Sequence, residues 1–120
     1  MIAISSVDHN GERVDGSGYG ACLKLVGPSS VDKTNAITTT DRTGEKGYNK
    51  GDSDTDYDDL DYTNTFHGTS AAAPSIAGSF ALLYSIYPGL TRQEALDIVL
   101  STDSKVSPDA ANYDVNGHSE

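Results

Sequence analysis

The first part of the chain alternates short apolar runs with polar turns. Residues 1–7 combine a loose alternation with β-branched side chains, and residues 23–26 and 37–40 carry shorter runs of the same kind. Period-two patterns rich in β-branched residues favour strands. Gly27-Pro28 ends the second run. The pattern therefore predicts three short strands before the middle of the chain.

The second part of the chain carries a helical pattern. Apolar residues recur at the spacing of one helix face over residues 70–86, and a Tyr-Pro-Gly sequence at residues 87–89 ends the run. Pro74 fits in the first turn, where its missing N–H has no partner. Thr91 and Glu94 form a capping box that begins a second helix. The predicted face of the first helix consists of Ala73, Ile76, Ala77, Phe80, Leu83 and Tyr84.

Between these parts, residues 42–62 are polar and without apolar periodicity, which predicts one long loop. Six aspartates fall within residues 52–61. Carboxylates at this density can wrap a calcium ion, which takes about six to eight oxygen ligands. The loop is not an EF-hand, because Tyr57 stands where that loop needs Gly. The residues nevertheless favour a solvated acidic loop, kept extended by its like charges, and a calcium site is the alternative. The candidate calcium ligands are Asp52, Asp54, Asp56 and Asp58.

Composition and charge exclude several classes of function. The 120 residues suffice for one small domain and include 36% hydrophobic residues. The net charge of −10 disfavours nucleic acids and anionic membrane surfaces as partners. No apolar run is long enough to span a bilayer, so we expect no membrane insertion. Met1 leads into a predicted strand rather than a basic leader, so we expect no signal peptide in this chain.

Cys22 is the only cysteine, so the chain can form no intrachain disulfide. Free cysteines are usually buried. We therefore expect Cys22 to be buried and inert, and pairing with a segment outside these residues is the alternative.

Ser70 stands at the predicted start of the first helix, after Gly68 and Thr69 and before small residues. Small neighbours let a substrate approach the backbone, and a helix N-terminus offers free N–H groups where an oxyanion can form. Taken alone, these residues favour a simpler interpretation, in which Ser70 is the N-cap of an alanine-rich buried helix, because serine caps are common.

The longer stretch around Ser70 reverses that preference. Residues 66–78 read Phe-His-Gly-Thr-Ser-Ala-Ala-Ala-Pro-Ser-Ile-Ala-Gly, which closely resembles the active-serine block of the subtilase (subtilisin-like serine protease) family. The three alanines and residues 37–41 resemble the kexin-like branch. Further segments resemble the flanks of that block in the same order, namely residues 2–11, 17–28 and 88–91.

The resemblance covers residues 1–106 and implies a fold. We expect these residues to be the C-terminal portion of a subtilase catalytic domain, which is an α/β, parallel-sheet, three-layer fold with an active-serine helix and a following helix. Residues 107–120 are expected to be an irregular tail. A sheet without its central partners would expose strand edges and apolar helix faces, so we expect partial disorder or self-association.

The resemblance also implies a serine endopeptidase with a Ser-His-Asp triad. Ser70 would attack the scissile carbonyl, while its own N–H and Thr69, beside Gly68, would serve the oxyanion and substrate. In subtilisin the catalytic His precedes the Ser by about 150 residues. Only 69 residues precede Ser70. We therefore expect the catalytic His and Asp and the oxyanion Asn to lie upstream, and the isolated chain to be inactive.

His67 is close to Ser70 in sequence, but no orienting carboxylate is evident, so we reject it as the general base. A kexin-like preference for basic residues is weakened because Gly18 stands at or near a position where that branch has glutamate.

The expected partners are a protein or peptide substrate and the missing N-terminal part of the protease domain. The parent protein is expected to be secreted. The resemblance strengthens the case for calcium, because subtilases often bind it, although the chemistry itself requires no cofactor. The rival hypothesis is a non-catalytic acidic module, derived from a subtilase, that binds calcium.

Overall fold

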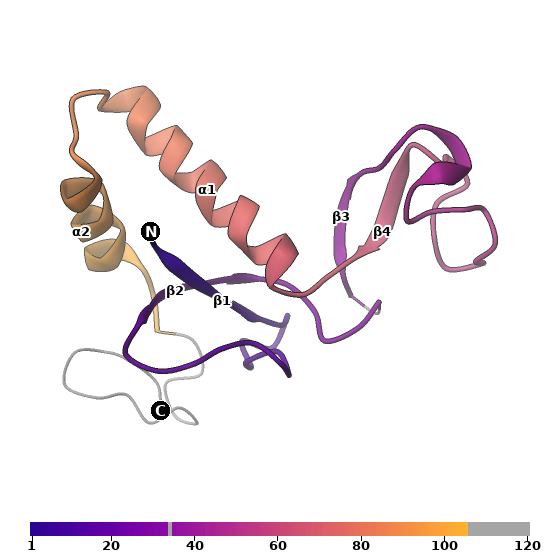
Figure 1. The fold of residues 1–120 in the computed structure, drawn as a ribbon, viewed down its shortest axis with the longest axis horizontal. Helices are drawn as coiled ribbons and strands as arrows, with labels where there is room; N and C mark the ends of the chain where they lie inside the picture. Colours follow the sequence, from indigo (N-terminus) through magenta and orange to yellow (C-terminus); the bar gives the residue numbers. More distant parts are fainter. Residues whose placement is uncertain (34, 106–120) are drawn as a thin grey trace.

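The computed structural model describes residues 1–33 and 35–105. Helices α1 and α2 lie with strands β1 and β2, whereas β3 and β4 form an arm that projects to one side (Figure 1). The expected α/β organisation is confirmed. The tail at residues 107–120 lies outside the described residues. The elements are β1 (Ala3–Val7), β2 (Leu23–Pro28), β3 (Ile37–Thr40), the 3-10 helix η1 (Gly44–Lys46), β4 (Tyr62–Phe66), α1 (Thr69–Ile86) and α2 (Arg92–Thr102).

Strands β1 and β2 form a parallel pair, with Ile4 opposite Leu25 and Val7 opposite Pro28. Helix α1 packs against both strands. Parallel strands need a long connection between them, and here residues 8–22 make it without a helix. The predicted strands at residues 1–7 and 23–26 are therefore confirmed, and β2 continues through Gly27-Pro28 instead of ending there.

Buried serines hold this connection against β1. Ser5, Ser6 and Ser17 are all at most 5% exposed. The Ser17 hydroxyl lies 2.6 Å from the Ser5 hydroxyl and accepts a 2.9 Å hydrogen bond from the Ser6 amide. Ser5 also donates to the Gly18 carbonyl at 2.7 Å. Because every hydroxyl has a partner, these polar groups can be buried without the penalty of unsatisfied hydrogen bonds.

Helix α1 meets the sheet through its smallest residues. Ala71 and Ala72 are 1% and 0% exposed. Of the six residues predicted to form the helix face, Ile76, Phe80, Leu83 and Tyr84 are half-buried, whereas Ala73 and Ala77 are exposed. The two buried residues of α1 both lie in its first turn, and the residues further along the predicted face are at most half-buried.

Helix α2 begins with the expected capping box. The Thr91 hydroxyl accepts from the Glu94 amide, and the Glu94 carboxylate accepts from the Thr91 amide at 2.8 Å. Ala95 and Leu96 are the residues of α2 that are buried. Among the described residues, no helix is long and apolar enough to cross a membrane.

The arm contains an antiparallel pair of β3 and β4, and β4 falls at the end of the region expected to be one long loop. Its interior is polar, since Thr63, Thr65 and Asn49 are buried there. The Asn49 side-chain amide donates to the Tyr57 carbonyl at 2.7 Å and to the Tyr62 carbonyl at 3.0 Å. One buried asparagine thus ties the loop to β4.

Candidate active site

Ser70 is the second residue of α1 and is exposed. The chain leaves β4 through His67 and turns into the helix at Gly68, which is the N-cap and has φ 78° and ψ −176°. The interpretation of Ser70 as an N-cap is therefore wrong, because the cap is a glycine without a side chain and Ser70 is already helical. The Ser70 hydroxyl is therefore not used to cap the helix.

The first turn of α1 leaves the polar groups of Ser70 open. Among the described residues, neither its hydroxyl nor its amide N–H has a hydrogen-bond partner. The Gly68 carbonyl instead accepts from the Ala71 amide at 3.0 Å and from the Ser29 hydroxyl at 2.8 Å. A free N–H at a helix N-terminus beside a free hydroxyl is an arrangement that can stabilise an oxyanion.

The two predicted neighbours of Ser70 lie with it at this helix start. Thr69 is the first helical residue and is exposed, whereas Gly68 is half-buried. The structure thus brings Gly68, Thr69 and Ser70 to one accessible corner where the arm joins the body (Figure 1).

Neither described histidine activates Ser70. The His67 Nδ1 lies 2.8 Å from the Thr65 carbonyl, and because a carbonyl only accepts, this nitrogen carries the proton. No hydrogen bond joins His67 to Ser70 in the described part of the chain. His9 is exposed in the turn after β1. Neither of these two histidines is therefore placed to act as the general base for Ser70.

The candidate calcium ligands do not come together as a site. Within residues 1–33 and 35–105, no group of three or more His, Cys, Asp or Glu residues could hold a metal ion. Asp52, Asp54 and Asp58 are exposed. Asp56 is committed to the arm, where its carboxylate accepts from the Asn64 amide at 2.9 Å and from the Thr63 hydroxyl at 2.8 Å. The described structure therefore gives no support to these four residues as a calcium site, and their role as ligands stays a prediction.

Hydrogen bonds also lower the pKa values of two carboxyl groups in the arm, those of Asp56 and Asp41. Burial by itself raises the pKa of the Asp56 carboxyl, but hydrogen bonds from Asn64, Thr63 and Tyr57 outweigh burial and hold it below its ordinary value. The pKa of Asp41 is lowered as well, chiefly by the hydrogen bond from the Asn49 amide. In its ionised form, each of these two carboxylates accepts hydrogen bonds that stabilise the arm.

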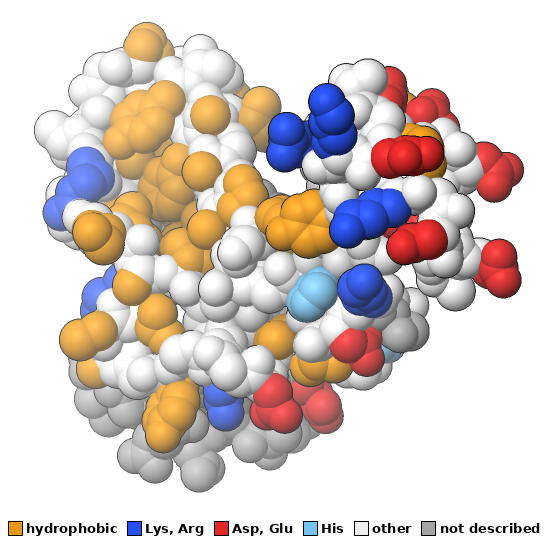
Figure 2. All heavy atoms as spheres, turned by 45° about the vertical axis from the view of Figure 1, so that its right-hand side comes forward, with side chains coloured by type: hydrophobic (Ala, Val, Ile, Leu, Met, Phe, Trp, Pro, Cys, Tyr) orange, Lys and Arg blue, Asp and Glu red, His pale blue; other side chains and the backbone are white. Residues whose placement is uncertain are grey.

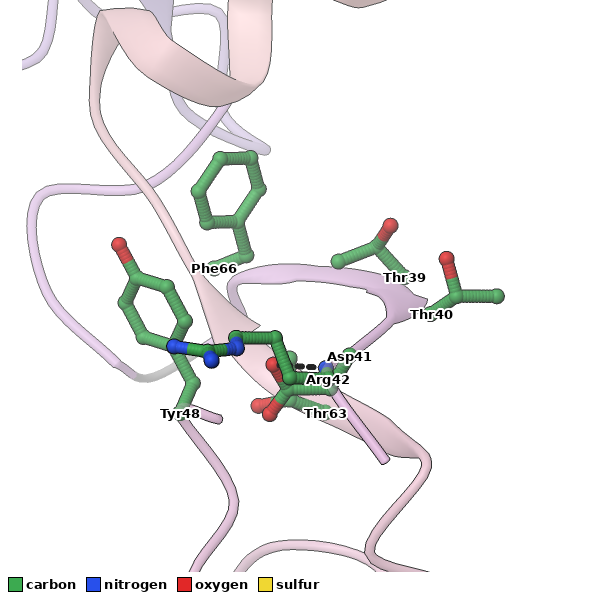
Figure 3. A pocket seen from close by; sticks show the side chains of 7 residues that line it. All are labelled: Thr39, Thr40, Asp41, Arg42, Tyr48, Thr63 and Phe66. Atoms are coloured by element: carbon green, nitrogen blue, oxygen red, sulfur yellow. Dashed lines mark hydrogen bonds between the residues drawn. The ribbon is translucent and has the colours of Figure 1, made fainter. Parts of the chain in front are cut away.

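A cavity of about 270 Å³ lies on the arm, between β3, β4 and the loop that follows β3. Tyr48 and Phe66 meet edge to face on one side, with ring centroids 5.6 Å apart. Thr39 lies opposite, and the Arg42 side chain reaches toward the Tyr48 ring (Figure 3). The sequence analysis did not foresee this cavity, and the aromatic residues that flank the loop were the available signal.

Cys22 is exposed, so the expectation that it is buried is wrong. It lies at the end of the connection just before β2, where Ala21 is exposed as well and Leu23, the first residue of β2, is half-buried.

With this geometry described, the chain can be set beside known proteins. A sequence profile of the Subtilase family, peptidase S8, matches residues 1–117. The calcium-dependent protease of Trichormus variabilis is 35% identical over 99% of this chain and 18% of its own length. The Aeromonas extracellular serine protease of Aeromonas sobria is 31% identical over 88% of this chain and 19% of its own length. The chain thus spans about a fifth of the length of these relatives.

Solved structures agree with the sequence relatives. The crystal structure of the Aeromonas sobria serine protease in complex with a chaperone superposes with a TM-score of 0.82 at 26% identity, over 98% of this chain and 22% of that one. A second crystal structure of the same protease gives a TM-score of 0.79 at 27% identity.

Proposed function

Because the chain belongs to the subtilase family, we propose that it carries the nucleophile of a serine endopeptidase, with Ser70 as the residue that forms the acyl-enzyme. The observation that carries this proposal is the open hydroxyl and N–H of Ser70 at the start of α1, directly behind the Gly68 turn. A serine buried in the helix or used as a cap could not reach a substrate.

The proposed chemistry follows from this geometry. The Ser70 Oγ attacks the scissile carbonyl carbon, and the carbonyl oxygen becomes an oxyanion that the Ser70 N–H stabilises with help from Thr69. A histidine from the upstream part of the catalytic domain takes the proton from Oγ and delivers it to the leaving amine. Water then hydrolyses the acyl-enzyme and restores the Ser70 hydroxyl.

The proposed partners are a protein or peptide substrate and the upstream portion of the protease domain. One relative is named an extracellular protease, which supports an extracellular parent protein. The relatives are named calcium-dependent protease and extracellular serine protease rather than kexin, so the kexin-like leaning gains no support from them and the basic-residue preference stays a prediction.

Calcium enters the proposal only through the names of relatives. The described residues offer no group of three or more His, Cys, Asp or Glu residues that could hold a metal, so calcium binding by Asp52, Asp54, Asp56 and Asp58 stays a prediction. For the same reason the rival hypothesis, an acidic calcium-binding module, finds no supporting site in the described structure.

A fluorophosphonate probe tests the role of Ser70. We expect the full-length protein to be labelled at Ser70, as mapped by peptide mass spectrometry, and the isolated 120-residue chain to remain unlabelled. Ser70→Ala should abolish labelling and lower kcat by roughly 10⁶-fold. Proteolysis that persists in Ser70→Ala would overturn the role of Ser70, and labelling of the isolated chain would overturn its predicted inactivity.

A further inference from the structure

The end of β2 and the residue after it contact the first turn of α1 at two points. A Cβ atom placed on Gly27 would lie 2.7 Å from the Ala72 carbonyl oxygen and 3.0 Å from the Ala72 Cα, so only glycine lets the strand approach this closely. Two residues further along, the Ser29 hydroxyl donates to the Gly68 carbonyl at 2.8 Å. Ser70 lies between the two contact points on the helix.

Ser29 is held firmly enough to act as a fixed point. It is 4% exposed, and its amide donates to the Val7 carbonyl of β1 at 2.7 Å. Its hydroxyl therefore connects the parallel sheet to the turn at Gly68. Helix α1 has no side-chain cap, since Gly68 cannot supply one. The Ser29 hydroxyl does not replace a cap, because it donates to a carbonyl rather than accepting from a free N–H. It restrains the N-cap residue by holding the Gly68 carbonyl in place.

We propose that Ser29 is a positioning residue for Ser70, fixing the Gly68 carbonyl and with it the orientation of the first turn of α1. This inference rests on the proposed function for its catalytic consequence. Its structural part, the restraint of the helix start by Ser29, stands without it.

Loss of this hydrogen bond should free the turn without removing any group that touches substrate. Small displacements of a nucleophile from its attack geometry can cost up to about 10²-fold in rate. We expect Ser29→Ala in the full-length protein to lower kcat by about 10-fold while KM changes by less than about 2-fold, because binding contacts are retained. Ser29→Thr keeps the hydroxyl and should recover most of the lost kcat.

The matched control is Ser30→Ala. Ser30 has the same exposed fraction of 4%, and its hydroxyl accepts a hydrogen bond from the Asp32 amide at 3.4 Å. A general effect of deleting a buried hydroxyl would appear in both variants. A positioning effect should appear in Ser29→Ala alone, at temperatures where each variant remains folded.

Amide hydrogen exchange, followed by mass spectrometry on the full-length protein, separates the structural part from the catalytic part. We expect Ser29→Ala to accelerate exchange at the Ala71 and Ala72 amides, which bond to the Gly68 carbonyl, and to leave the C-terminal turn of α1 unchanged. Unchanged exchange at both amides, or an equal acceleration in Ser30→Ala, overturns the inference. A third outcome separates the two proposals. If exchange is faster in Ser29→Ala but the fluorophosphonate probe does not label Ser70 in the wild-type protein, the proposed function is overturned while the restraint by Ser29 is supported.

Discussion

At the residue scale, the orientation of Ser70 depends on the backbone of Gly68. Its φ of 78° and ψ of −176° lie in a region that residues with a Cβ rarely adopt. A Cβ at this position would meet no atom within 4 Å. Glycine is therefore required at position 68 because of its backbone dihedral angles and not because a side chain would lack space. A substitution at this position tests the cost of the backbone conformation without adding a steric clash.

We predict that Gly68→Ala destabilises the protein by about 1–3 kcal/mol, the usual cost of a strained backbone conformation. Urea unfolding followed by circular dichroism should show a lower midpoint with an unchanged slope. Gly78→Ala is the control, since Gly78 lies within α1 with open space around it. It should raise stability by about 0.5–1 kcal/mol, because alanine favours a helix interior. Equal midpoints for Gly68→Ala and wild type would contradict the prediction.

Single residues also show what the sequence could and could not predict. The family resemblance indicated Gly68, Thr69 and Ser70 because their identities are specific. It did not indicate Ser29, because a serine after a strand has no distinctive pattern and its role comes from a contact across 39 positions. Cys22 was predicted wrongly, because a rule about average burial says nothing of a residue on a surface connection.

At the element scale, the arm is the part that sequence patterns described least well. Strand β4 reads Tyr-Thr-Asn-Thr-Phe, and its buried positions are the threonines Thr63 and Thr65. A search for apolar alternation overlooks such a strand, because hydrogen bonds rather than apolar contacts satisfy its interior. Both ends of α1 and the start of α2 were predicted to within a residue, because apolar spacing and the capping box are local signals.

We predict that acid, and not chelation of metal, opens the arm. The pKa of Asp56 lies below its ordinary value of 3.8 in the folded chain, so its contribution to stability is present above that value and is lost as pH falls through the folded pKa. In ¹H–¹⁵N spectra the Asn64 amide resonance, whose proton bonds to Asp56, should therefore shift with a midpoint below pH 3.8. At neutral pH, neither EDTA nor calcium should move it.

Two variants sharpen this prediction. Asp56→Asn should remove the acid transition at Asn64, because the group that titrates is gone. Asp58→Asn should leave the acid transition at Asn64 unchanged, since Asp58 is exposed and its carboxylate accepts no hydrogen bond in the described part of the chain. A resonance shift on adding calcium at neutral pH would show instead that the loop binds the cation.

At the scale of the whole molecule, the described fold is thin and extended. Its principal extents are 48 × 37 × 19 Å and its radius of gyration is 16.3 Å, compared with about 13.5 Å for a compact domain of this length. A thin fold covers few apolar side chains. On α1 and just after it, Leu82, Ile86 and Tyr87 are 71%, 68% and 57% exposed, and Figure 2 shows hydrophobic side chains gathered over the helices while charged ones gather over the arm.

This exposure agrees with the small share of the relatives' length that the chain covers. The chain matches about a fifth of each relative, and α1 packs on the sheet mainly through Ala71 and Ala72. The sequence analysis expected open apolar faces for this reason, and the exposed fractions bear that out. What it could not predict is which part of α1 stays open, since that depends on the angle at which the helix crosses two short strands.

We predict that the isolated chain associates with a second copy through this open end of α1. Exposed apolar patches drive association, and a second copy can cover the same patch by two-fold symmetry. The net charge of −10 opposes association, so screening of this charge by salt should strengthen association.

In sedimentation velocity, the apparent mass should rise with protein concentration and with salt. Leu82→Lys combined with Ile86→Lys should keep the chain monomeric, because it places two charges on the apolar patch. Ser85→Lys adds one positive charge at a neighbouring exposed position without removing an apolar side chain, and it should weaken association only slightly. A wild-type chain that stays monomeric in high salt, or a double variant that associates as the wild type does, would show that α1 does not form this contact.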